Sequence, residues 1–191
     1  MNNIAIFASG SGSNAQAIIE HFLAKEKKPV KLILSNKADA YVLERAKKLD
    51  IKSIVFNKEQ FYNSDTIINT LENEKIELIV LAGFLWLIPD NILKKFSNRI
   101  INIHPALLPK FGGKGMYGMK VHEAVVANKE TQSGITIHYV NEEYDRGEII
   151  FQAKCTVTPN DTAEMVAQKI HELEYTHFPR IVEQIASQPI K

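Results

Sequence analysis

Short apolar runs alternate with amphipathic stretches along the first hundred residues. The runs are rich in β-branched residues, which is typical of strands covered on both faces. They lie at 4–8, 30–34, 51–56, 78–82 and 100–104. Between them apolar residues recur at helical spacing, as at Ala15, Ile18, Ile19 and Phe22. This alternation predicts an α/β fold, a doubly wound and mostly parallel sheet with helices on both faces.

Helix boundaries are predicted from capping residues and breakers. One helix is expected over 64–74, and the next is expected to be capped by Asp90. In the second half we expect a helix over 121–127 and strands over 134–140 and 148–153. The last helix is expected to start at a capping box from Asp161 to Glu164, and to break or kink at Pro179.

Composition excludes several classes of protein. The 191 residues are enough for one domain with a substantial core, so a single domain over 1–191 is expected. The net charge of +1, with no basic block, disfavours a nucleic-acid surface. No apolar run approaches the ~20 residues that span a bilayer, and no signal-peptide pattern opens the chain. With one cysteine, Cys155, these features favour a cytoplasmic protein.

A glycine- and serine-rich loop at 9–14 joins the first expected strand to the first helix. Strand, flexible loop and helix start together offer backbone N–H groups and a positive helix end to an anion. The loop is not a P-loop, because no Gly-Lys-Ser/Thr closes it, and the third glycine of a dinucleotide fingerprint is missing. A phosphomonoester site is favoured, with a tight turn and serine cap as the alternative.

Asn102 and His104 interrupt the apolar run at 100–104. Because they are two positions apart, their side chains leave the same side of the strand, and Pro105 then ends ladder pairing. Polar groups at the exit of a strand lie where open α/β sheets bind ligands. A lone histidine at a strand end is more often a structural residue, so the other segments must decide its role.

Two unusual loops flank this strand in the sequence. The segment 83–89 is almost entirely apolar and predicts either a slot for a planar ligand ring or simple helix packing. The segment 110–119 contains four glycines and predicts a mobile lid that orders when ligand binds, with a loose surface loop as the alternative.

An acidic turn at 141–147 offers a partner for His104. A carboxylate beside an imidazole raises the pKa of the ring, but physical reasoning does not select among Glu142, Glu143 and Asp145. Thr136 and His138 share one face of the preceding strand, where they could hold a water or orient that carboxylate.

The remaining histidines are expected to be surface or packing residues. They are His21, His122, His171 and His177. No pair of His or Cys residues has ligand spacing, so no metal site is expected.

The run Asn102-Ile103-His104-Pro105-Ala106-Leu107-Leu108-Pro109, with Tyr144-Asp145-Arg146-Gly147 downstream, resembles the folate-dependent formyltransferase family. The loops at 10–14, 35–40 and 81–84 extend the resemblance over almost the whole chain. It implies a Rossmann-like formyltransferase fold, with a phosphate-binding half at about 1–100 and a folate-binding and catalytic half at about 78–191.

This resemblance also implies residue roles. Asn102, His104 and Asp145 match the family's catalytic trio. Binding of the substrate phosphate and ribose is expected at Gly12, Ser13, Asn14 and Glu174. The folate pocket is expected at Leu85, Trp86, Leu87, Ile88, Asn102 and Val140. The chain departs from the family at Trp86, where many relatives have an arginine, and near Ser64, where a basic residue is often found.

The reaction implied by the resemblance is transfer of a formyl group from 10-formyltetrahydrofolate to the amine of glycinamide ribonucleotide, in purine biosynthesis. The amine attacks directly, Asn102 and His104 hold the oxyanion, His104 delivers a proton to N10, and no metal takes part. The expected partners are small molecules, with neither nucleic acid nor membrane, and the expected state is a monomer or a homodimer.

Other functions stay open at this point. The first is a formyltetrahydrofolate hydrolase, which is disfavoured because such enzymes carry a further N-terminal domain. A relative that formylates methionyl-tRNA is disfavoured because neither an RNA-binding domain nor a basic patch is found. A nucleotide-phosphate binding protein without chemistry would leave Asn102, His104 and Asp145 unexplained.

Overall fold

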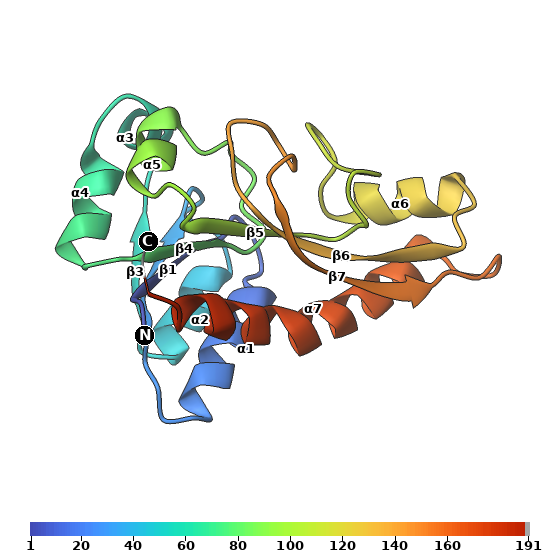
Figure 1. The fold of residues 1–191 in the computed structure, drawn as a ribbon, viewed down its shortest axis with the longest axis horizontal. Coiled ribbons are helices and arrows are strands. Elements are labelled where there is room, and N and C mark those ends of the chain that lie inside the picture. Colours follow the sequence, from blue (N-terminus) through green and yellow to red (C-terminus); the bar gives the residue numbers. More distant parts are fainter. Residues whose placement is uncertain (190–191) are drawn as a thin grey trace.

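Seven strands form a single sheet in the computed structural model, which describes residues 1–189 of the chain (Figure 1). The strand order is β3-β2-β1-β4-β5-β6-β7. The strands are β1 (Ile4–Phe7), β2 (Val30–Ser35), β3 (Lys52–Val55), β4 (Leu78–Leu81), β5 (Ile100–His104), β6 (Gln132–Tyr139) and β7 (Ile149–Thr156). Strands β1 to β5 are parallel to one another, β6 is antiparallel to β5, and β7 is antiparallel to β6. The predicted fold class is confirmed.

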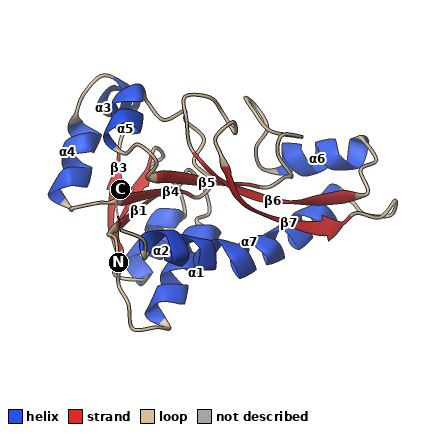
Figure 2. Ribbon diagram, viewed as in Figure 1, coloured by secondary structure: helices blue, strands red, loops and turns tan. Residues whose placement is uncertain are grey.

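Helices cover both faces of this sheet (Figure 2). They are α1 (Ser13–Leu23), α2 (Val42–Lys48), α3 (Lys58–Tyr62), α4 (Thr66–Asn73), α5 (Asp90–Lys95), α6 (Met119–Ala127) and α7 (Ala163–Ala186). Alternate residues of each central strand enter opposite cores. In β1, Ile4 and Ile6 pack with α1 and α7, whereas Ala5 and Phe7 pack with α3, α4 and α5. Each large apolar side chain buried in this way contributes about 1.5–3 kcal/mol to the stability of the fold.

Strand β5 lies between a parallel and an antiparallel neighbour. It pairs with β4 on one side and with β6 on the other. The antiparallel register sets Asn102 opposite His138 and His104 opposite Thr136. The polar positions of both strands therefore gather on one face of the sheet, as their spacing in the sequence predicts.

Two helix starts differ from the sequence prediction. Helix α3 was not expected, and it begins with a capping box in which the Asn57 and Gln60 side chains each accept the other's backbone N–H at 2.9 Å. The prediction that Asp90 caps α5 is wrong. Pro89 occupies the cap position without a side-chain hydrogen bond, and Asp90 lies in the first turn, where a carboxylate favours the positive helix end.

Helix α7 also differs from its prediction at its start, and it is not broken at Pro179. Thr162 is the cap, because its hydroxyl accepts the Met165 N–H at 3.3 Å, while the Asp161 carboxylate accepts the Thr158 N–H at 2.9 Å. The expected break at Pro179 is absent, since the helix continues to Ala186. Burial of this part of α7 in the core outweighs the local cost of proline. Among the helices described, none combines the length and hydropathy needed to cross a membrane.

An ion-pair cluster fastens the end of α1 to α7. The Glu183 carboxylate contacts His21 Nε2 at 2.8 Å, Lys27 Nζ at 3.2 Å and also Lys25 Nζ. The hydrogen bonds from Lys25 and His21 lower the pKa of Glu183 from 4.5 to about 2. The ionised carboxylate is therefore the form that the folded state favours.

We predict that this cluster supports the fold in mild acid. A depressed carboxyl pKa contributes stability above the unfolded value of 4.5, and this contribution is lost as pH falls towards the folded value of about 2. Unfolding by urea, measured between pH 6 and pH 2, should show Glu183→Gln less stable than wild type near pH 6 and converging with it near pH 2.

The exposed Glu172→Gln substitution on the same helix is the control and should follow wild type throughout. A constant difference between Glu183→Gln and wild type at every pH would contradict the ion-pair interpretation.

Candidate active site

A cavity of about 590 Å³ opens where loops leave the carboxyl ends of β1, β4 and β5. Its lining combines the loop at 10–14, the segment 81–88, the exit of β5 at 102–105 and the glycine-rich loop at 113–118. Crevices at the strand ends of open α/β sheets are the usual position of ligand sites. The loops that the sequence analysis singled out separately thus surround one space.

Every residue predicted for the site contributes to this lining. These residues are Gly12, Ser13, Asn14, Leu85, Trp86, Leu87, Ile88, Asn102, His104, Val140, Asp145 and Glu174.

The start of α1 forms one end of the cavity. Gly12 is the cap residue with φ +72°, and a Cβ there would lie 2.4 Å from Val42 Cγ2, so the position requires glycine. The start of α2 supports the loop, because Val42 N–H donates to Gly10 O at 3.1 Å and Arg45 Nε donates to Ser11 O at 2.7 Å. No side chain caps α1, so its first N–H groups stay available to an anion.

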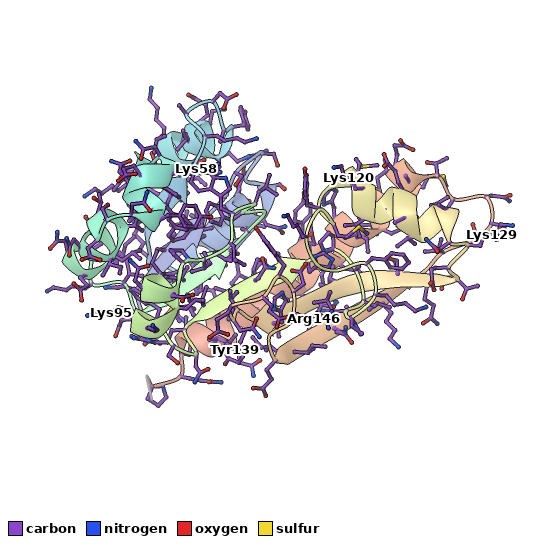
Figure 3. All side chains as sticks on the ribbon, turned by 90° about the horizontal axis from the view of Figure 1, so that it is seen from above. Lys58, Lys95, Lys120, Lys129, Tyr139 and Arg146 are labelled. Atoms are coloured by element: carbon purple, nitrogen blue, oxygen red, sulfur yellow. The ribbon has the colours of Figure 1, made fainter. Side chains whose placement is uncertain are left out.

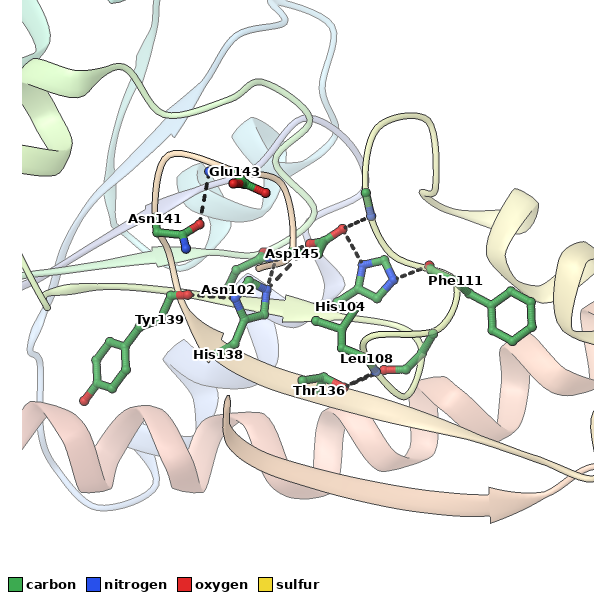
Figure 4. Close-up of polar contacts among 12 residues, drawn as sticks. Asn102, His104, Leu108, Phe111, Thr136, His138, Tyr139, Asn141, Glu143 and Asp145 are labelled. Carbon is green, nitrogen blue, oxygen red and sulfur yellow. Dashed lines mark hydrogen bonds and ion pairs between the residues drawn. The ribbon is translucent and has the colours of Figure 1, made fainter. Parts of the chain in front are cut away.

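Asp145 lies at the centre of the polar contacts (Figure 4). Its Oδ2 accepts the Gly113 N–H at 2.9 Å and lies 3.4 Å from His104 Nδ1. Its Oδ1 accepts from Asn102 Nδ2 at 3.4 Å and lies 3.6 Å from His138 Nε2. One carboxylate therefore joins side chains of β5 and β6 to the glycine-rich loop.

The path of the acidic turn selects Asp145 among its three acids. Asp145 adopts φ +56°, a conformation that Asp tolerates better than most residues. The turn closes back on β6 at Gly147, where an added Cβ would lie 1.6 Å from Tyr139 O. Glu142 and Glu143 are exposed, and in Figure 4 the Glu143 carboxylate lies away from His104.

His104 has an oxygen acceptor at each ring nitrogen. Its Nε2 lies 2.7 Å from Phe111 O, which fixes the proton there, and its Nδ1 faces Asp145. Burial lowers the pKa of His104 below its ordinary value of 6.5, and the Asp145 charge opposes this shift. Burial thus disfavours the charged ring, whereas the two acceptors, Phe111 O and the Asp145 carboxylate, favour it.

The two neighbours on β6 differ in what they do. His138 Nδ1 donates to Tyr139 O at 2.8 Å, and its Nε2 lies 3.1 Å from Asn102 Nδ2 and 3.6 Å from Asp145 Oδ1. The prediction that Thr136 orients the carboxylate is wrong. Its hydroxyl donates to Ala106 O at 2.7 Å and accepts the Leu108 N–H at 3.0 Å, so it holds the proline-flanked segment after β5.

The apolar segment after β4 packs against the core on one side and lines the cavity on the other. Ile88 is buried in the core, whereas Leu85 is 38% exposed and lines the cavity. The Trp86 ring packs 5.8 Å from the Phe61 ring and also borders the cavity. Core packing thus fixes a mostly apolar wall for a ligand.

Two lysines, labelled in Figure 3, lie over aromatic rings that line the cavity. Lys58 Nζ lies 5.9 Å from the centre of the Trp86 ring, and Lys120 Nζ lies 4.9 Å from the centre of the Tyr117 ring. Positive charge near the rim favours the approach of an anionic ligand.

Sequence reasoning missed two histidines of the cavity. His122 on α6 and His171 on α7 were assigned to surface or packing, but both line it. His171 Nδ1 lies 2.9 Å from Glu174 Oε2, and this contact raises the pKa of His171. The i,i+3 spacing of His171 and Glu174 could have indicated a shared helix face. For His122 no such signal exists in the sequence.

Within residues 1–189 no three His, Cys, Asp or Glu side chains gather as a metal site would require. The donors present are instead amide, imidazole and backbone groups, which suit hydrogen bonding to organic ligands.

The sequence pattern of the formyl transferase family matches residues 2–182. The chain belongs to the formyl transferase family. This confirms the resemblance drawn from the residues around Asn102, His104 and Asp145.

Similar proteins agree with this assignment. Phosphoribosylglycinamide formyltransferase of Bacillus subtilis is 38% identical over 192 residues, which cover 97% of this chain and 95% of the relative. The chloroplastic enzyme of that name from Arabidopsis thaliana is 40% identical over 98% of this chain, which spans only 66% of the plant protein. The crystal structure of the Streptococcus pneumoniae enzyme is 37% identical, with a TM-score of 0.86 over 97% of this chain and 99% of the other.

We predict that Asp145 controls the protonation of His104. Since the carboxylate opposes the effect of burial, Asp145→Asn should lower the pKa of His104 further. Titration of the His104 ring followed by NMR measures this shift. The control is Glu142→Gln in the same turn, which removes an exposed carboxylate and should leave the His104 titration unchanged. An equal shift in both variants would contradict the contact as its cause.

Proposed function

We propose that the protein transfers the formyl group of 10-formyltetrahydrofolate to the amine of glycinamide ribonucleotide, a step of purine biosynthesis. The observation that carries this proposal is one cavity in which an anion-binding helix start, an apolar wall and a buried Asn–His–Asp cluster meet. The names of the relatives support the same acceptor.

Each part of the two substrates has a complementary surface. The phosphate binds the N–H groups at Gly12, Ser13 and Asn14, and the ribose hydroxyls donate to the Glu174 carboxylate. The pterin ring lies along 85–88 and Val140, where large apolar side chains line the cavity. The formyl carbon and the amine then meet beside Asn102 and His104.

The first chemical step is attack of the neutral amine on the formyl carbon. A C–N bond forms while the carbonyl π pair moves onto oxygen, so negative charge develops there. Asn102 Nδ2 and the His104 ring are the donors that hold this oxyanion. The 3.1 Å contact with His138 fixes the Asn102 amide in advance, and one Nδ2–H exchanges its long 3.4 Å contact with Asp145 for the oxyanion.

The second step moves a proton between the two nitrogens. The attacking nitrogen becomes positively charged and must lose a proton, while N10 must gain one before its bond to carbon breaks. The imidazolium form of His104, whose charge Asp145 stabilises, gives its Nε2 proton to N10, and the vacated Nε2 then takes the proton that the attacking nitrogen loses. The reaction uses two small molecules and needs neither a metal ion nor a covalent enzyme intermediate.

We predict acceptor-dependent deformylation. Purified protein incubated with 10-formyltetrahydrofolate should release tetrahydrofolate only when glycinamide ribonucleotide is present, because the amine is the nucleophile. The absorbance change of the folate measures turnover. Equal turnover without the amine would indicate a hydrolase, and no turnover in either case would contradict the proposed activity.

We predict that Asn102→Ala lowers kcat by about 10²–10³-fold, because one preorganised oxyanion donor is removed. Steady-state kinetics with both substrates varied would separate this loss from changes in KM. Asn128→Ala, which removes an exposed amide after the last turn of α6, is the matched control and should keep near-wild-type kcat. A kcat for Asn102→Ala within a few-fold of wild type would rule out this role.

A further inference from the structure

His122 is a buried polar side chain that the contacts of the site do not explain. It lies on α6, only 3% exposed, and its ring lines the cavity. Its Nδ1 is enclosed without a hydrogen-bond partner among the described residues. Buried polar atoms in native proteins are rarely left unpaired, so the position of the ring proton decides what this side chain can bind.

The chemistry of the ring defines what that group must be. Burial lowers the pKa of His122, with the His171 charge acting in the same direction, so the ring is neutral at pH 7. A neutral imidazole carries one N–H and one lone pair. An enclosed N–H costs more to leave unpaired than an enclosed lone pair, so the proton belongs on Nε2, the nitrogen that is not enclosed. Nε2–H then offers a single neutral donor to the cavity.

The position of His122 further narrows the choice of the ligand group that it contacts. Helices α6 and α7 pack together, and His122 lies within electrostatic reach of Glu174, His171 and His104. In glycinamide ribonucleotide, the group between the ribose and the reactive amine is an amide. Its carbonyl oxygen is a neutral acceptor without a hydrogen to donate, which matches a lone N–H. The phosphate is matched instead by the helix start at Gly12.

We propose that His122 binds the acceptor substrate by donating its Nε2–H to the carbonyl oxygen of the glycinamide group. This inference rests on the proposed function. The contact fixes the amide between the ribose at Glu174 and the formyl group at His104, and so sets the direction from which the amine approaches the formyl carbon.

Binding measurements on the full chain without folate test this contact. Wild type and three variants are titrated by calorimetry with glycinamide ribonucleotide and, separately, with ribose 5-phosphate, which lacks the amide. His122→Leu removes the donor, His122→Gln places an amide N–H near the Nε2 position, and His122→Asn places one near the Nδ1 position. Thermal melting of each variant reports whether it folds.

We expect His122→Leu to weaken glycinamide ribonucleotide by about tenfold and to leave ribose 5-phosphate within about twofold, because one hydrogen bond to the amide is lost. His122→Gln should recover most of the affinity and His122→Asn should not. If the leucine variant does not fold, the comparison of the Gln and Asn variants carries the test, together with the ¹⁵N shifts of the His122 ring, which should report Nε2–H.

Other results overturn the proposal. Equal weakening of both ligands would move the contact to the ribose or phosphate, and no weakening of either would make His122 a packing residue. Recovery by Asn rather than Gln, or a proton on Nδ1, would contradict the assigned donor. Failure of the wild-type protein to bind glycinamide ribonucleotide would instead overturn the proposed function, and it would be seen before any variant is compared.

Discussion

The Asp145 carboxylate is the group on which the geometry of the site depends. It is 11% exposed and contacts Gly113, Asn102, His104 and His138, which come from a loop and two strands. Burial alone would raise its pKa, but the contacts from His138, His104 and Gly113 together outweigh that effect and lower it. A buried charge is tolerated only when it is paired in this way. The pairing of the Asp145 carboxylate therefore holds the loop and both strands together.

The sheet topology makes this convergence possible. After β5 the chain passes through the glycine-rich loop and α6 before it returns as β6. The antiparallel β6 sets His138 directly opposite Asn102, and the turn at 141–147 folds back across the same face. The change from parallel to antiparallel pairing at β5 is therefore part of how the site is built.

The sequence predicted those features of the fold and the site that depend on neighbouring residues. The strand and helix order follows from apolar periodicity, and the common face of Asn102 and His104 follows from the two-residue repeat of a strand. The choice of Asp145 could not be made from the sequence, because it depends on the path of a turn that closes at Gly147.

The features that the sequence analysis missed or predicted wrongly depend on residues far apart in the sequence. Helix α3 depends on a single capping box that the periodicity does not mark, and α7 continues through Pro179 because Phe178 and Val182 beside it are buried in the core. His122 resembles any histidine of an amphipathic helix until α6 packs against α7 at the edge of the cavity. In each case tertiary packing decides an outcome that neighbouring residues leave open.

The glycine-rich loop explains how a buried acid–base pair stays satisfied without a ligand. Phe111 O accepts from His104 Nε2, and two residues later Gly113 N–H donates to Asp145, so one short segment matches both members of the pair. Leaving either group unpaired would cost about 1–3 kcal/mol, more than the ~1 kcal/mol that a typical hydrogen bond contributes net. A ligand oxygen that takes over His104 Nε2–H replaces one acceptor by another, so the exchange is nearly balanced in free energy. The His104–Asp145 pair can therefore be hydrogen-bonded before binding and still release its donor to a substrate.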